Sequence, residues 1–313
     1  MNETAQAGYL AQGPFSEAGE GERLLMALVK DPGPDPRAIA ERIRGLDVHV
    51  FWRSAYGLAE DRERSRDETN LRRLPDRLAA IAAANASLGR KRDSVLPLPP
   101  ERRIIGNCRD FSLFFAAALR EAGIPARARC GFGMYFMPNH GEDHWVVERW
   151  DAASSRWLIS DPQLDAIMTD RLKVPFDPMD LPDGAFLSGG EAWLACRKGD
   201  NPGRYGIFDM SGWDFVMGDF VRDLAALAGL ELLPWDLWGI MEKPFASLDA
   251  EDLTALDAAA AVSPMRAPLA RAEAARLLAD PRFALPRKIR SYVEGRMVDV
   301  DLGPGIGSGS RTD

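Results

Sequence analysis

Cys108 stands directly after Asn107, at the start of the run CRDFSLFFAAALREAG. Asparagine is a good helix N-cap residue, because its side-chain oxygen accepts a hydrogen bond from a free N–H of the first turn. Phe111 and Phe115 follow at helical spacing, so Cys108 shares their buried stripe, and Gly123 is placed to end the helix. The positive end of a helix stabilises a thiolate, which is the attacking form of cysteine. The spacing therefore predicts a thiol at the first turn of an amphipathic helix, directed along its buried face. From the helix alone the alternative to a nucleophile is a small, inert core residue, because free cysteine is commonly buried.

A nucleophilic cysteine needs a base, and the chain contains 3 histidines. His144 opens the β-rich run HWVVERW, and the run WLISD, ending at Asp161, returns as the second strand of a predicted hairpin. Antiparallel pairing brings the start of the first strand beside the end of the second, so His144 is expected to face Asp161. A carboxylate there would orient the imidazole. His140 is a rival base, but Pro138 and its neighbours place it in a loop, so we favour His144.

A zinc site is a second reading of the same stretch. Cys130, His140 and His144 offer a thiolate and two imidazoles, and histidines four residues apart are a known ligand spacing on helices. Glycines and a proline interrupt this stretch, so it is not a helix and the spacing loses its geometric meaning. We therefore expect no metal and no cofactor, and structural roles for Cys130 and Cys196.

Three separated blocks of the sequence resemble the transglutaminase-like superfamily of cysteine enzymes. They agree in order and spacing with a pattern in which a cysteine begins a buried helix, the helix ends in a Gly-Ile-Pro-Ala-Arg turn, and a histidine and an aspartate follow on adjacent strands. The blocks are NCRDFSLFFAAALREAGIPARARCGFG (107–133), DHWVVERWD (143–151) and RWLISDPQ (156–163). The resemblance implies a papain-like α+β fold with Cys108 as nucleophile, His144 as base and Asp161 as the orienting acid.

The resemblance does not identify the substrate, since the superfamily includes cross-linkers, peptidases, amide-forming enzymes and inactive members. Family members also use an upstream side chain to hold the oxyanion, for which Trp52 and Asn107 are both candidates. We expect Asn107, His140 and Trp145 to contact a small-molecule or peptide substrate.

The leading hypothesis for function is cysteine-dependent acyl transfer, with an acyl-enzyme on Cys108 and cleavage, exchange or formation of an amide bond. One alternative is arylamine N-acetyltransferase-like transfer from coenzyme A. The Arg-Gly-Gly-x-Cys block of those enzymes reads Ile-Ile-Gly-Asn-Cys here, at 104–108, which argues against it. The other alternative is a catalytically silent binding module, although all three triad positions are retained.

Composition excludes several classes of partner. The chain has 313 residues and a formal net charge of −8, and an acidic protein is a poor ligand for nucleic acid. No run approaches the ~18 apolar residues of a membrane span, and no secretory leader is recognisable, so we expect a cytoplasmic protein that binds no membrane. The oligomeric state stays open.

The predicted fold class is α+β, with the cysteine-bearing helix packed on an antiparallel sheet and helical regions at both ends. Residues 1–22 are expected to be loosely held, and a helix over 67–88 should break near Pro75. The predicted parts are an N-terminal helical region packed on the core (1–95), a transglutaminase-like catalytic core (96–175), a mostly helical C-terminal region (176–302) and a disordered tail (303–313).

Overall fold

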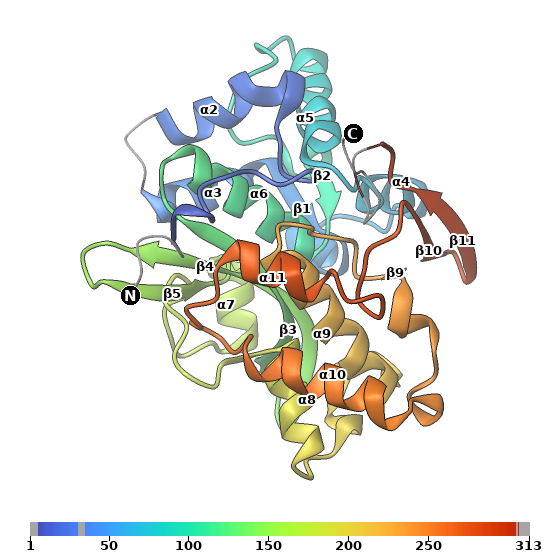
Figure 1. Ribbon diagram of the computed structural model, residues 1–313. Helices are drawn as coiled ribbons and strands as arrows, with labels where there is room; N and C mark the ends of the chain where they lie inside the picture. The colour runs from blue at the N-terminus through green and yellow to red at the C-terminus, as the bar shows by residue number, and fades with distance from the viewer. Residues whose placement is uncertain (1–5, 31–34, 305, 307–313) are drawn as a thin grey trace. The chain divides into compact units, whose positions relative to one another are not determined.

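The computed structural model describes residues 6–30, 35–304 and 306 (Figure 1). The described residues form two compact units. The cysteine unit comprises residues 6–128 and 145–182, and the C-terminal unit comprises 129–144 together with the described residues from 183 onward. The chain therefore crosses between the two units three times, and two of these crossings lie inside a β-strand.

The cysteine unit consists mainly of helices around α6. In Figure 1, α3 (blue) and α6 (green) lie side by side, and α2 also packs against α6. Its helices are α2 (Glu22–Lys30), α3 (Pro36–Leu46), α4 (Arg62–Thr69), α5 (Leu74–Ser87), α6 (Cys108–Glu121) and α7 (Ala166–Leu172). Its short strands are β1 (Asp47–His49), β2 (Ile104–Gly106) and β5 (Arg156–Ser160).

Helix α6 begins and ends at the residues that the sequence predicts. Asn107 is its N-cap, and Gly123, with φ +75°, follows its C-terminus in a conformation that favours glycine. The sequence predicts one buried stripe along this helix, but every residue from Cys108 to Arg120 is buried. Contacts with α2, α3 and β2 explain this, since helices and a strand surround α6 on several sides.

The hairpin of β3 (Ala126–Met137) and β4 (His140–Asp151) runs through both units. The sheet order is β6-β3-β4-β7-β8, and β5 pairs with β4. Within the cysteine unit β4 and β5 are antiparallel, with Val147 opposite Ser160. The predicted hairpin is thus confirmed as an antiparallel pair, although β4 is longer than the predicted 144–150 and β5 ends at Ser160, one residue before the predicted end.

The C-terminal unit completes that sheet and adds helices. Helices α8 and α9 pack closely, because a Cβ on Gly189 would lie 2.5 Å from the backbone of Phe220. Its helices are α8 (Gly189–Arg197), α9 (Trp213–Leu227), α10 (Ala250–Ala261) and α11 (Arg271–Leu277). Its further strands are β6 (Phe186–Ser188), β7 (Tyr205–Ile207), β8 (Met210–Ser211), β9 (Asp236–Leu237), β10 (Lys288–Val293) and β11 (Arg296–Asp301).

The expectation of a loosely held N-terminal segment is wrong for its described part. Tyr9 and Phe15 are buried, and the backbone oxygen of Tyr9 accepts a hydrogen bond from Ala126 N at 3.1 Å. Apolar side chains scattered among glycines supply this anchoring. The predicted break near Pro75 is confirmed, because Pro75 stands at the start of α5. Of the tail 303–313, residues 305 and 307–313 lie outside the described residues.

Among the described residues, no helix has both the length and the apolar character needed to cross a bilayer. No disulfide involves any of the three cysteines, and all three side chains are buried.

Candidate active site

Cys108 is the first residue of α6, and 8% of its surface is exposed. A reciprocal pair of hydrogen bonds fixes this helix start. Asn107 Oδ1 accepts from Asp110 N at 3.2 Å, and Asp110 Oδ2 accepts from Asn107 N at 3.0 Å. Such a capping box satisfies two N–H groups that would otherwise have no partner. The thiol is therefore placed on a rigid, positively polarised helix end.

A buried ionic network supports the capping box. Arg77 bridges two carboxylates, with Nη2 2.7 Å from Asp110 Oδ2 and Nη1 2.9 Å from Asp47 Oδ2. Arg109 Nη1 contacts the other oxygen of Asp110 at 3.1 Å. These four side chains are at most 1% exposed. Burial raises the pKa of Asp47 to about 7, because the attraction of Arg77 offsets only part of the desolvation.

Strands β1 and β2 bring this network to Cys108. They pair in parallel, with His49 opposite Gly106, and Gly106 leads directly into Asn107. A Cβ on Gly106 would lie 3.1 Å from Arg77 Nη1, so a glycine leaves room for the guanidinium. The sequence did not predict this network, because the only signal of Asp47 and Arg77 is a charged residue within an otherwise apolar segment.

Asp161 is fully buried in the cysteine unit, immediately after β5. Its Oδ1 accepts from Gln163 N at 3.0 Å, and its own N–H donates to Pro178 O at 2.7 Å. Arg44 Nη1 donates to the next carbonyl, that of Pro162, at 3.0 Å. These bonds hold the Asp-Pro turn from both sides, so the carboxylate has a defined orientation.

His144 and His140 lie in the C-terminal unit. The His144 side chain is 2% exposed and has aromatic neighbours, with ring centroids 4.8 Å from Phe136 and 6.1 Å from Tyr135. His140 is half-buried, and its Nε2 lies 3.3 Å from Gly206 O. Both histidines belong to β4, which begins at His140, so the expectation that His140 lies in a loop is wrong. The turn between β3 and β4 takes up only residues 138 and 139, so His140 already pairs as part of the strand.

Asn107 and Trp145, two of the residues expected to contact substrate, belong to the cysteine unit. Asn107 is 4% exposed, and its Nδ2 has no hydrogen-bond partner among the described residues. Trp145 is completely buried, and its Nε1 likewise lacks a partner in that part of the chain. Trp52, the other candidate for an oxyanion donor, is half-buried in the short 3-10 helix Val50–Tyr56.

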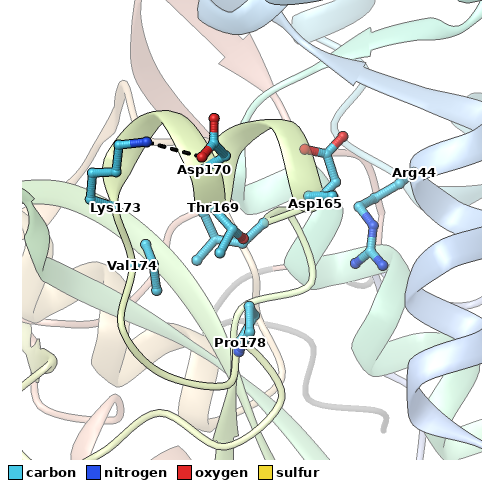
Figure 2. A pocket seen from close by; sticks show the side chains of 9 residues that line it. Arg44, Asp165, Thr169, Asp170, Lys173, Val174 and Pro178 are labelled. Atoms are coloured by element: carbon cyan, nitrogen blue, oxygen red, sulfur yellow. Dashed lines mark hydrogen bonds and ion pairs between the residues drawn. The ribbon is translucent and has the colours of Figure 1, made fainter.

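A shallow pocket of about 620 Å³ lies at α7 and the loop that follows it (Figure 2). Figure 2 shows Lys173 bonded to Asp170 at its rim and Arg44 and Asp165 at its other side. The lining residues are Arg44, Leu164, Asp165, Ala166, Thr169, Asp170, Lys173, Val174 and Pro178. Neither Cys108 nor Asp161 lines this pocket, so it adds nothing to the candidate thiol chemistry.

Comparison with known proteins supports the resemblance seen in the sequence. Residues 66–162 match the family model described as the transglutaminase-like superfamily. A crystal structure described as that of a "putative cysteine protease" from Cytophaga hutchinsonii is 14% identical, with a TM-score of 0.32. The alignment covers 52% of this chain and 43% of that one, so this chain matches less than half of the other protein's length. A search of curated proteins finds no match.

Proposed function

We propose that this chain, whose residues 66–162 match the transglutaminase-like superfamily, is a cysteine-dependent acyl-transfer enzyme. Its proposed triad is Cys108, His144 and Asp161. Cys108 acts as nucleophile, His144 as the base and acid that moves its proton, and Asp161 as the carboxylate that orients the imidazole. The observation that carries the proposal is the start of α6, where a thiol heads a buried helix behind a complete capping box.

The alternation of side chains along β4 supports the partnership of His144 and Asp161. Val147 pairs with Ser160, so Asp161, one residue later, is level with Val146 and shares its face of the strand. His144 is two residues before Val146 in the same strand, and alternation gives it that same face. A shared face of paired strands is what the proposed partnership of these two side chains requires.

Asn107 supplies a candidate donor for the oxyanion. Its Oδ1 is engaged by the capping box, whereas its Nδ2 has no partner among the described residues. A buried amide N–H without a partner is costly, and a developing negative charge beside the cysteine would satisfy it. The N–H groups of the first turn of α6 would add to this stabilisation.

The proposed reaction begins as His144 takes the thiol proton and the sulfur of Cys108 bonds to an amide carbonyl carbon. The carbonyl oxygen carries the negative charge until the C–N bond breaks, and the imidazolium gives its proton to the leaving amine. The product is a thioester on Cys108. Attack by water regenerates the thiol and releases an acid, while attack by a second amine releases a new amide.

Alkylation separates this proposal from a silent binding module. Iodoacetamide should modify Cys108 faster than Cys196, because burial raises the pKa of the Cys196 thiol to about 11. His144→Ala should slow alkylation of Cys108 and leave that of Cys196 unchanged. Equal rates at the two cysteines in the folded wild type, measured by peptide mass spectrometry, would contradict an activated thiol.

Turnover is tested with a panel of activated esters and peptide amides. The wild type should accumulate an acyl adduct on Cys108, visible by intact mass, and Cys108→Ala should abolish both adduct and turnover. Cys196→Ala is the matched control, since it removes another buried thiol and should keep full activity. Background rates for both wild type and Cys108→Ala would favour the binding module. An adduct formed only with acetyl-coenzyme A would favour the acetyltransferase alternative.

A further inference from the structure

A second cluster of ionisable side chains lies wholly within the C-terminal unit. It consists of Cys130 on β3, Asp143 on β4 and Asp219 on α9, far apart in the sequence. The Sγ atom and one oxygen of each carboxylate lie within 4.8 Å of one another. Cys130 is 0% exposed, Asp143 9% and Asp219 1%. Three groups that can each carry a negative charge are therefore gathered out of contact with bulk water.

Two oxygens of this cluster lack the hydrogen bonds that buried carboxylates normally make. Within the described part of the chain, Asp143 Oδ1 and Asp219 Oδ2 have no partner. Arg222 Nη1 binds the other oxygen of Asp219, Oδ1, at 2.9 Å, so it does not satisfy Oδ2. A buried oxygen without a partner is expected to bind something that the protein itself does not supply.

We propose that Cys130, Asp143 and Asp219 bind a divalent transition-metal ion, with zinc as the ion that fits best. Zinc accepts both thiolate and carboxylate ligands, at about 2.3 Å and 2.0–2.2 Å, whereas magnesium and calcium prefer oxygen alone. Those bond lengths place tetrahedral ligand atoms about 3–4 Å apart, so small side-chain rotations would close the cluster around the ion.

Charge balance favours a divalent ion. The thiolate and two carboxylates carry three negative charges, and the ion together with the Arg222 guanidinium supplies three positive ones. Without an ion the buried groups retain protons instead. Burial raises the pKa of Cys130 and of Asp219, and raises that of Asp143 to about 6. On binding, the thiol proton and any carboxyl proton pass to solvent as the metal–ligand bonds form.

The bound ion would connect three elements on the side of β4 opposite His144. Asp143 directly precedes His144, and alternation along the strand directs the two side chains to different faces. The ion would therefore hold β4 against β3 and α9 without entering the proposed active site. This differs from the zinc set considered from sequence, which shared Cys130 but used His140 and His144.

Cobalt(II) provides a direct test, because cobalt–thiolate bonds give a charge-transfer absorption in the near ultraviolet. The full-length Cys108→Ser variant, which removes the proposed nucleophile as a ligand, is treated with chelator and titrated with cobalt and then zinc. We expect one ion per chain, a thiolate band that zinc abolishes, and a rise in Tm on binding. Excess calcium should change neither the band nor the Tm.

Ligand variants locate the site. In the Cys108→Ser background, Cys130→Ser should remove the thiolate band. Asp219→Asn should weaken metal binding by at least about 100-fold, because mutating a residue that only orients a metal ligand already lowers metal affinity by about 10–100-fold. Cys196→Ser is the matched control and should bind as the parent does. Circular dichroism shows whether each variant folds.

A folded parent protein that shows no thiolate band and no bound zinc would overturn the proposal, whatever the variants do. Undiminished binding by a folded Cys130→Ser variant would also overturn it. In both cases the cluster would be a hydrogen-bonded set of a thiol and protonated carboxyls.

Discussion

Arg77 Nη2 lies 2.7 Å from Asp110 Oδ2, the same oxygen that accepts the backbone N–H of Asn107 at 3.0 Å. One guanidinium therefore supports the cap of the helix that carries Cys108. A single carboxylate oxygen shared between a cap and an ion pair couples the position of the thiol to residues on α5 and β1.

Replacing Arg77 should therefore affect both stability and the thiol. Arg77→Met leaves Asp47 and Asp110 buried without their shared counter-charge, and breaking a buried pair in this way costs about 3–5 kcal/mol. Urea unfolding measures that loss. Arg62→Ala is the control, because Arg62 pairs with Glu60 at the surface, with side chains 87% and 74% exposed, and should be neutral. An unchanged unfolding free energy for Arg77→Met would show that the network does not hold α6.

The two roles of Asn107 can be separated by substitution. Asn107→Ala removes the cap and should cost about 1 kcal/mol, whereas Asn107→Asp keeps an acceptor at the N-cap and should nearly preserve stability. Both variants lack the Nδ2 donor, so both should acylate Cys108 more slowly than the wild type. If Asn107→Asp acylates at the wild-type rate, the side chain of Asn107 does not stabilise the oxyanion.

The buried carboxyl of Asp47 should make the stability of the protein depend on pH. Its pKa rises from 3.8 to about 7 on folding, so the folded state holds a proton that the unfolded chain releases. This contribution to stability is complete below about pH 4 and is lost as the pH rises through about 7. Asp47→Asn, which cannot ionise, should flatten the profile of unfolding free energy against pH in this range. Superimposable slopes for the two proteins would refute the assignment.

A second buried pair, between Arg127 and Glu148, holds β3 against β4 in the cysteine unit. Arg127 Nε lies 2.7 Å from Glu148 Oε2, and its guanidinium lies over the rings of Trp157 and Tyr9, at 4.5 Å and 5.0 Å. Glu148→Ala should destabilise the protein by about 3–5 kcal/mol, because a buried cation then loses its partner.

Differential scanning calorimetry of Glu148→Ala measures that effect. Arg156→Ala is the control, since its partner Asp180 is partly exposed and the pair should contribute little. Equal Tm values for the two variants would show that the aromatic rings alone stabilise Arg127.

Local signals explain what the sequence could predict. Asn107 and Gly123 bracket α6, and the β-rich run from His144 lies within β4, because caps, turns and strand propensity act between neighbours. The meeting of Arg77 with Asp110 depends on distant segments and carries no periodic signal. The same holds for the approach of Asp219 to Cys130, so both clusters became visible only in three dimensions.

The threefold passage of the chain between the two units has a practical consequence for anyone dividing this protein into fragments. Residues 129–144 are an excursion from one unit into the other and back, so no single cut yields either unit as one uninterrupted polypeptide. A fragment that stops at 128 would end before the rest of β3 and all of β4, and one that begins at 145 would start in the middle of β4. Expression trials that split the chain at those points should give aggregates rather than two independent folding bodies.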